Sequence, residues 1–116
     1  MKPLLSEAAA VGAGGFAGAV VRHLVVGLTG STVGIISVNV AGCLVLGLLS
    51  QESKFALFVA TGFLGALTTF SALSGHAVKL WTSGEAVTAS LFVLINLFAG
   101  LAAFIAGLYI RGQVAA

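Results

Sequence analysis

Four long apolar stretches alternate with three short polar joints along this chain. The apolar stretches run over about 5–27, 33–50, 55–80 and 86–110. Each approaches or exceeds the roughly 20 residues that a helix needs to cross the hydrocarbon core of a bilayer. The joints, at 27–32, 50–54 and 82–85, contain glycine, serine, threonine and charged residues that are typical of turns. The pattern predicts four transmembrane helices, with both chain ends on one side of the membrane.

The third apolar stretch contains a polar interruption, GFLGALTTFS at 62–71. One or two hydroxyls in a spanning helix commonly bond back to a carbonyl of the preceding turn. Here Thr68, Thr69 and Ser71 place three hydroxyls within four residues, about one turn after Gly65. This cluster favours a break near the middle of the third helix, where released carbonyl oxygens can bind a small cation.

Small residues recur in three of the four predicted helices. Gly14 and Gly18 form a small-xxx-small pair in the first helix. The corresponding residues of the second and fourth helices are Gly42, Gly47, Gly100, Ala103 and Gly107. Such residues let helix backbones approach closely, which is a main source of attraction between helices in lipid. Four short helices with glycine on their faces enclose little volume, so we expect an oligomer to complete the core.

Composition narrows the possible functions. Of 116 residues, 59% are hydrophobic and 7% are charged, so positions 1–116 are expected to form one integral membrane domain of the all-α class. A net charge of +2 on so few ionisable groups is not the basic stripe of a nucleic-acid-binding protein. No Ser/His/Asp, Cys/His or glycine-rich phosphate arrangement points to an enzyme.

The basic residues give almost no preferred orientation. Lys2, Lys54 and Arg111 fall on the side of the termini, and Arg22 and Lys79 fall near the other side, three against two. The positive-inside rule needs a clear excess of Lys and Arg to orient a chain. We therefore expect dual topology, in which two copies meet in opposite orientations.

The positions of the carboxylates indicate which kind of solute could pass through the membrane interior. Glu7, Glu52 and Glu85 all lie at chain ends or joints. A small proton-coupled multidrug exporter needs a carboxylate at mid-membrane to bind substrate and proton in turn. The uncharged interior therefore favours an anion path over an exporter.

Other polar residues lie within or near the ends of the predicted helices, and each has a structural and a functional interpretation. Arg22 lies late in the first helix, where its long side chain can reach the interface or attract anions into a wet vestibule. Asn39 and Asn96 lie deeper, in the second and fourth helices. An amide there is either a hydrogen-bond clamp between helices or a donor facing a pore. His23 and His76 have no partner at metal-ligand spacing, so no metal site is predicted from them.

On these residues, the chain resembles the small bacterial fluoride channels of the Fluc, or CrcB, family along nearly its full length. The matching stretches are GGFAGAVVR at 14–22, VNVAGC at 38–43 and GFLGALTTFS at 62–71. The third stretch, with Asn39 and Arg22 at the corresponding distances upstream, is specific to this family. The resemblance implies a fluoride-selective channel, with several membrane passes in the bacterial plasma (inner) membrane, that lets accumulated cytoplasmic fluoride leave passively.

The resemblance also implies an assembly and a set of site residues. Two antiparallel subunits would form a dual-topology dimer with two fluoride pores between them. A structural sodium ion would lie at the dimer centre, bound by backbone carbonyl oxygens at the matching positions Gly65 and Thr68. The residues expected along the fluoride path are Arg22, Asn39, Thr69, Phe70, Ser71 and, in the fourth helix, Asn96. Fluoride, sodium and membrane lipid are the expected partners.

Two positions depart from the family pattern. Leu73 stands where the family has a second pore phenylalanine, and Ile35 stands where it has a threonine. Both changes replace a fluoride-contacting group with an aliphatic one. The chain is therefore expected to form a homodimer with an altered lining, or to be a pore-degraded subunit that pairs with a second family member. A purely structural assembly subunit is a further alternative, in which the polar residues only hold helices together.

Overall fold

The computed structural model describes residues 2–49 and 54–112, which form helices joined by short turns. In chain order the elements are α1 (Lys2–Thr29), α2 (Ser31–Leu48), α3 (Lys54–Ala56), the π-helical η1 (Leu57–Leu64), α4 (Gly65–Leu67), α5 (Phe70–Thr82) and α6 (Ala86–Arg111). Within the described residues, four stretches are long and apolar enough to cross a membrane: 3–29, 31–48, 57–82 and 86–111. The prediction of an all-α, multi-pass membrane protein is confirmed.

Glycines set two of the turns between these helices. Gly30, between α1 and α2, has φ +89°, and Gly84, between α5 and α6, has φ +84°. A residue with a Cβ is strained at such angles, so both turns require glycine. The first turn is shorter than the predicted joint at 27–32, because α1 continues to Thr29 and α2 begins at Ser31. Of the predicted joint at 50–54, residues 50–53 lie outside the described residues.

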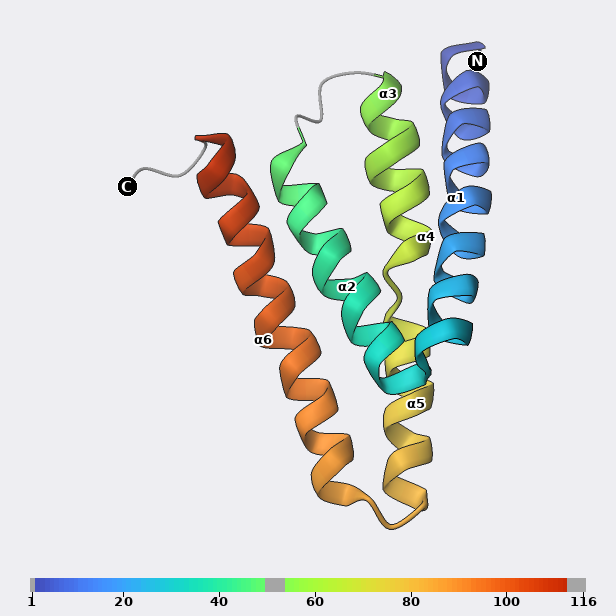
Figure 1. The fold of residues 1–116 in the computed structure, drawn as a ribbon. Coiled ribbons are helices and arrows are strands. Elements are labelled where there is room, and N and C mark those ends of the chain that lie inside the picture. The colour runs from blue at the N-terminus through green and yellow to red at the C-terminus, as the bar shows by residue number, and fades with distance from the viewer. Residues whose placement is uncertain (1, 50–53, 113–116) are drawn as a thin grey trace.

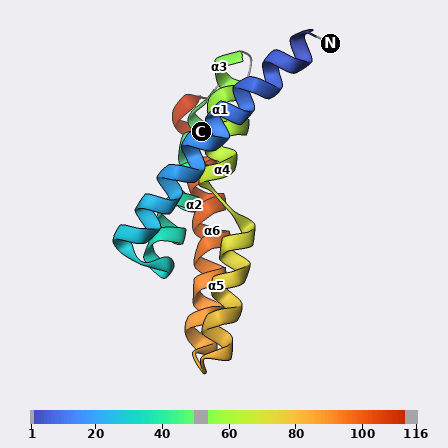
Figure 2. The ribbon, with the colours of Figure 1, turned by 90° about the vertical axis from the view of Figure 1, so that its right-hand side faces the viewer.

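The helices lie side by side rather than around one central core (Figures 1 and 2). α1 packs against η1 and α4, α2 packs against α6, and α5 pairs with α6. The molecule measures 51 × 37 × 24 Å. α1 begins and α6 ends at the same end of the molecule (Figure 1), as four crossings of a membrane require.

Glycines allow two of these helix pairs to touch backbone to backbone. A Cβ added to Gly18 of α1 would collide with the carbonyl oxygen of Phe63 in η1, and Gly14 faces η1 in the same way. Between α2 and α6, a Cβ added to Gly47 would collide with the carbonyl oxygen of Phe104. The small residues therefore decide which helix faces meet, because only glycine permits this approach.

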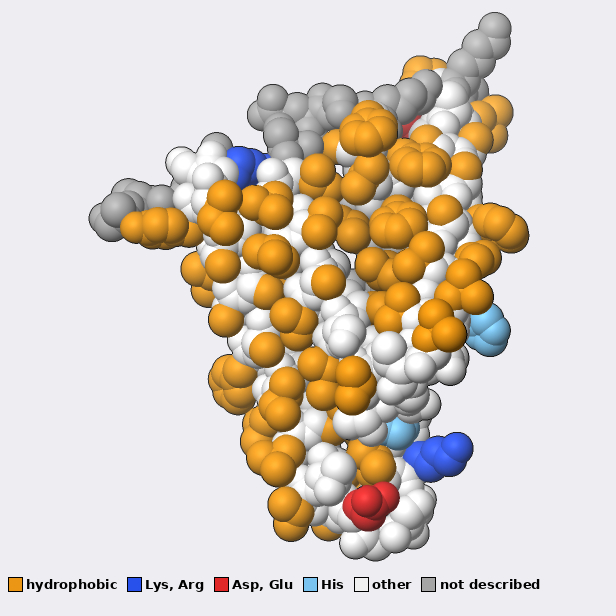
Figure 3. Space-filling model, viewed as in Figure 1, with side chains coloured by type: hydrophobic (Ala, Val, Ile, Leu, Met, Phe, Trp, Pro, Cys, Tyr) orange, Lys and Arg blue, Asp and Glu red, His pale blue; other side chains and the backbone are white. Residues whose placement is uncertain are grey.

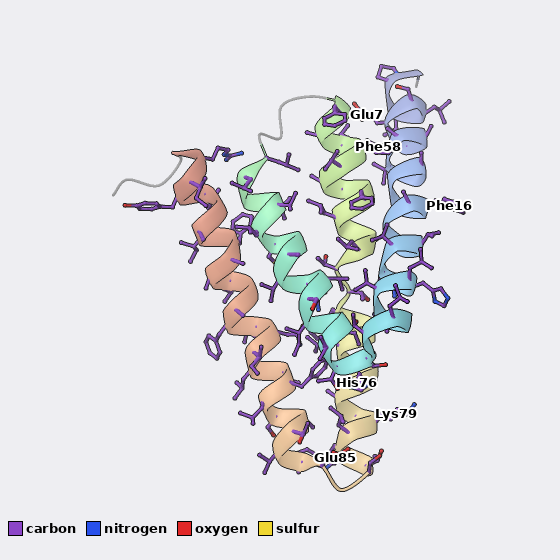
Figure 4. All side chains as sticks on the ribbon, viewed as in Figure 1. Glu7, Phe16, Phe58, His76, Lys79 and Glu85 are labelled. Carbon is purple, nitrogen blue, oxygen red and sulfur yellow. The ribbon has the colours of Figure 1, made fainter. Side chains whose placement is uncertain are left out.

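The buried core is small for a chain of this length. Its hydrophobic members are Ile35, Val38, Ala56, Ala60, Leu64, Leu67, Ala89 and Phe92. Large apolar side chains instead cover much of the outer surface, and the charged side chains that are visible in Figure 3 lie toward the two ends of this face. Phe16, for example, points away from the neighbouring helices (Figure 4). Such a surface is stable against lipid tails.

Candidate functional site

The third span is interrupted at Thr68 and Thr69. Both have extended backbone angles, φ −87° and ψ 141° at Thr68 and φ −151° and ψ 123° at Thr69. Thr68 Oγ1 donates to the Leu64 carbonyl oxygen at 2.9 Å. Thr69 is the N-cap of α5, because its Oγ1 accepts from the Ala72 N–H at 3.2 Å. Thr69 Oγ1 also lies 2.9 Å from Ser71 Oγ. The hydroxyls therefore form hydrogen bonds at the end of the helix before the interruption and at the start of α5 after it.

Two buried asparagines connect this interruption to the second and fourth spans. The Thr69 N–H donates to Asn39 Oδ1 at 2.9 Å. Asn39 Nδ2 donates to Asn96 Oδ1, and Asn96 Nδ2 donates to the Phe92 carbonyl oxygen, both at 2.8 Å. Asn39 is 8% exposed and Asn96 is 5% exposed, and an unpaired polar group at such a depth costs about 1–3 kcal/mol. The two amides therefore clamp α2, α6 and the third span together.

The bond from Thr69 also redirects the backbone of the third span. In a continuous α-helix the Thr69 N–H would donate to the carbonyl of Gly65, four residues earlier. That N–H donates to Asn39 instead, so the Gly65 carbonyl loses this partner. The next carbonyl, of Ala66, accepts from Arg22 Nε on α1 at 3.0 Å. Arg22 thus caps the C-terminal end of α4, where the helix dipole also favours a cation.

A groove of about 410 Å³ opens beside the interruption. Its lining brings together four of the predicted pore residues, Asn39, Thr69, Phe70 and Asn96. Leu73 lines the same groove, and no charged side chain does. Phe70 is 82% exposed, so its ring stands at the surface of the subunit beside the groove. Amide, hydroxyl and aromatic groups thus share one uncharged hollow.

Arg22 and Ser71 do not line this groove. Arg22 lines a second, polar pocket of about 400 Å³, which also contains Ile35. Leu73 lies in the groove instead. The two positions that depart from the family pattern therefore lie in different hollows of the subunit.

The two residues predicted to bind sodium share a third hollow. Gly65 and Thr68 line a cavity of about 80 Å³, together with Cys43 and Leu46 of α2. Gly65 is exposed at the surface of the subunit. The cavity therefore lies between the interruption and α2, next to the carbonyl that the Thr69 N–H leaves free.

Residues 9–108 match the family described as CrcB-like protein, Camphor Resistance (CrcB). The chain belongs to the CrcB family. The fluoride-specific ion channel FluC of Paracoccus denitrificans is 44% identical over 93 aligned residues, which cover 74% of this chain and 75% of that protein. The corresponding protein of Rhizobium johnstonii is 36% identical over 123 aligned positions, covering 94% and 98%. That of Methanocaldococcus jannaschii is 39% identical over 104, covering 80% and 84%. The predicted family is confirmed, and its named members are channels rather than enzymes.

Sequence reasoning did not predict that basic residues gather in this CrcB chain. Arg22 and His23 of α1 line the polar pocket together with His76 and Lys79 of α5. The histidines looked isolated because the two pairs are more than fifty positions apart. The matching spacing of small and basic residues on two separate helices is the signal that could have identified the pocket.

Proposed function

We propose that this chain forms a fluoride channel that lets cytoplasmic fluoride leave the cell passively across the bacterial plasma membrane. The relatives described above are named as fluoride-specific ion channels. The observation that carries the proposal is the uncharged groove in which Asn39, Asn96, Thr69 and Phe70 converge.

The groups in the groove suit a small, strongly hydrated anion. A path for fluoride must replace its water with close hydrogen-bond donors. Asn39 Nδ2 gives one N–H to Asn96, and an amide nitrogen carries a second N–H that can bind an ion. The Thr69 and Ser71 hydroxyls can donate as well. The edge of the Phe70 ring is electropositive, so it attracts an anion without a full charge, and several weak sites permit exit as well as entry.

Arg22 has a different role in this proposal, because it lies outside the groove. Its charge lies in the polar pocket, where it raises the local concentration of anions before they reach the narrow part of the path. Its bond to the Ala66 carbonyl keeps the guanidinium fixed beside the interruption.

We further infer that two subunits complete the path. Gly65, Phe70 and Ser71 are exposed, so the interruption reaches the surface of the single subunit. Irregular backbone is not stable against lipid, so protein must cover it. A second copy in the opposite orientation would cover it and close one groove on each side into a pore. Leu73 in the groove favours, as a second candidate, a partner that is another family member with a complete lining.

The same arrangement supports a structural sodium ion at the centre of the dimer. Carbonyl oxygens are the ligands that hard cations prefer. The Gly65 carbonyl lacks its usual helical partner, and Thr68 shares its cavity. Two opposed subunits would turn these oxygens toward each other, and a sodium ion between them would offset the repulsion of their dipoles.

The test is fluoride efflux from liposomes that contain only this purified chain, followed with a fluoride electrode. Rapid efflux of fluoride without efflux of chloride is the expected result for a homodimeric channel. Efflux that appears only after co-reconstitution with a second family member would support the heterodimer. Coupled uptake of an organic cation, with no fluoride efflux in either preparation, would contradict the proposal and favour the exporter.

A further inference from the structure

A polar pocket of about 400 Å³ lies between α1, α2 and α5 and shares no lining residue with the uncharged groove. Two helix faces with the same spacing form its walls. Positions i, i+3, i+4 and i+7 of α1 are Ala19, Arg22, His23 and Val26, and those of α5 are Ala72, Gly75, His76 and Lys79. Ser31 and Ile35 of α2 complete the lining. This spacing places all four residues of each helix on one face.

The pocket is open because the two walls do not pack on each other. Among the described residues, α1 contacts η1, α4 and α2 but not α5. Figure 2 shows the last turns of α1 diverging from α5 below the interruption. Three of the lining residues on these faces are small, Ala19, Ala72 and Gly75, and a Cβ added to Gly75 would meet no atom within 4 Å. Small side chains and diverging helices together leave room for a group much larger than fluoride.

The lining of the pocket carries basic groups from both walls and no carboxylate. Arg22 is fixed by the bond from its Nε to the Ala66 carbonyl, so its terminal nitrogens remain for a ligand. His76 Nε2 lies 2.7 Å from Thr32 Oγ1, and its ring meets Phe92 edge-on with centroids 5.0 Å apart. Lys79 lies one turn beyond His76 on α5 and is exposed (Figure 4). Two permanent cations therefore lie on opposite walls of one hollow.

We propose that this pocket binds a phosphate-class oxyanion, either free inorganic phosphate or the phosphate of a lipid headgroup. Arginine and lysine are the side chains that recognise phosphate, the first through its planar fork and the second as a point charge. A fluoride ion is too small to contact both walls at once, whereas an oxyanion has several oxygens to share between them. The site lies outside the uncharged groove, in the pocket from which Arg22 is proposed to attract fluoride, and phosphate binding there can be measured without fluoride conduction.

The experiment measures binding rather than transport. Inorganic phosphate is titrated by calorimetry into the purified chain in detergent free of phospholipid, with chloride at the same ionic strength as the control. Lys79→Gln removes the charge from one wall, and phosphate binding should weaken about fivefold or more, because a charged donor binds an oxyanion more strongly than a neutral amide does. Gly75→Leu fills the pocket without changing charge, and binding should be lost. Lys2→Gln, which removes the same charge at the far end of α1, should leave binding unchanged.

A lipid source is distinguished in a second arm. The same protein is mixed with phosphatidic acid or with diacylglycerol, which lacks the phosphate, and retained lipid is detected by native mass spectrometry. Retention of phosphatidic acid alone, reduced in Lys79→Gln and Gly75→Leu but not in Lys2→Gln, supports a lipid headgroup as the ligand. Phosphate binding in the first arm with the same pattern supports the free anion. Neither ligand binding to wild-type protein, or binding that both pocket variants leave intact, overturns the proposal.

Discussion

At the scale of single residues, Asn39 connects three spans through two hydrogen bonds. Its Oδ1 accepts from the Thr69 N–H, and its Nδ2 donates to Asn96. The sequence left open whether this amide is a clamp between helices or a donor that faces a pore. The structure shows the clamp and also places the residue in the lining of the uncharged groove. One amide can serve both roles, because its nitrogen has two N–H groups.

Asn39→Ala separates the channel from the structural alternative. The substitution leaves the Thr69 N–H and the Asn96 Oδ1 without these partners, at a cost of about 1–3 kcal/mol for each. We expect fluoride efflux from proteoliposomes to fall about tenfold or more, the equivalent of roughly 1.4 kcal/mol or above, in a dimer that still elutes intact. Ser90→Ala is the control, because Ser90 Oγ only bonds the Ala86 carbonyl on an exposed face of α6. Wild-type efflux from an intact Asn39→Ala dimer would favour a purely structural role for the amide.

Leu73→Phe tests whether the aliphatic residue limits conduction. Leu73 lines the groove with Phe70, so a ring at this position would present a second electropositive edge to the ion. We expect fluoride efflux to rise about twofold to tenfold, the equivalent of the roughly 0.5–1.5 kcal/mol that a well-placed ring contact contributes. Leu91→Phe adds the same ring on the exposed side of α6 and should change nothing. Equal or lower efflux in Leu73→Phe would mean that this position does not limit the flow of ions.

At the scale of elements, α1 and α2 hold the interrupted third span in place. α2 binds its interruption through Asn39, and α1 binds its first half through Arg22 and through glycine contacts with η1. These contacts fix the ends of α4 and α5 in space. The uncharged groove includes Thr69 of the interruption, and the polar pocket includes Arg22, which binds the end of α4, so the shapes of both hollows depend on these contacts.

Gly18→Ala tests the contact between α1 and η1. A Cβ at this position collides with the Phe63 carbonyl oxygen, which belongs to rigid backbone. We expect unfolding in detergent, followed by circular dichroism, at a lower temperature that corresponds to about 1–3 kcal/mol of overpacking. Gly12→Ala is the matched control, because a Cβ there meets no atom within 4 Å and alanine favours a helix by about 0.5–1 kcal/mol. Equal melting of the two variants would show that α1 does not need glycine for this approach.

At the scale of the whole molecule, the chain is a row of helices with a small core rather than a closed bundle. The polar interruption reaches the outer surface beside exposed apolar residues such as Phe70. Lipid cannot satisfy its backbone groups. This is the reason for the proposed second copy, which would cover the interruption and shield it from lipid.

Cross-linking in the membrane tests the antiparallel dimer. In a Cys43→Ala background, Gly65→Cys should join two chains through a short bismaleimide, because Gly65 is exposed beside the proposed two-fold axis. Gly27→Cys, near the end of α1, where an added Cβ would meet no atom within 4 Å, should give no dimer, because opposed subunits place it on opposite sides of the membrane. Efficient dimers from both variants would indicate parallel subunits.

Removal of sodium tests whether a structural sodium ion is bound at the centre of the proposed dimer. Replacing sodium with N-methyl-D-glucamine at constant chloride should lower the unfolding temperature of the dimer, since a ligand at a hundred times its dissociation constant adds about 2.7 kcal/mol to stability. Return of sodium should restore the original value. An unfolding temperature that is the same in both buffers would contradict a structural sodium ion.

Part of the candidate site could be predicted from residue types, and part only from the resemblance to the family. Asn39 and Asn96 are candidates as amides deep in predicted helices, whereas the resemblance implies the pore roles of Thr69 and Phe70. The structure brings all four residues into one groove. Arg22 was also named, yet its bond to the Ala66 carbonyl could not be, because a backbone oxygen leaves no signal in the sequence. The polar pocket was missed for a related reason, since its two basic walls belong to helices that meet only in space.

The sequence by itself determined four spans, an uncharged interior and the position of the polar interruption. The length and hydropathy of an apolar stretch, and a local group of hydroxyls, are each defined within a few turns of one helix. They can therefore be recognised in the sequence without knowing the fold. Only the tertiary structure decided which polar atoms meet. The bonds from Thr69 to Asn39, from Arg22 to Ala66 and from Asn39 to Asn96 join residues 30, 44 and 57 positions apart. Such pairs form because buried polar groups need partners, and helix packing determines which partners are within reach.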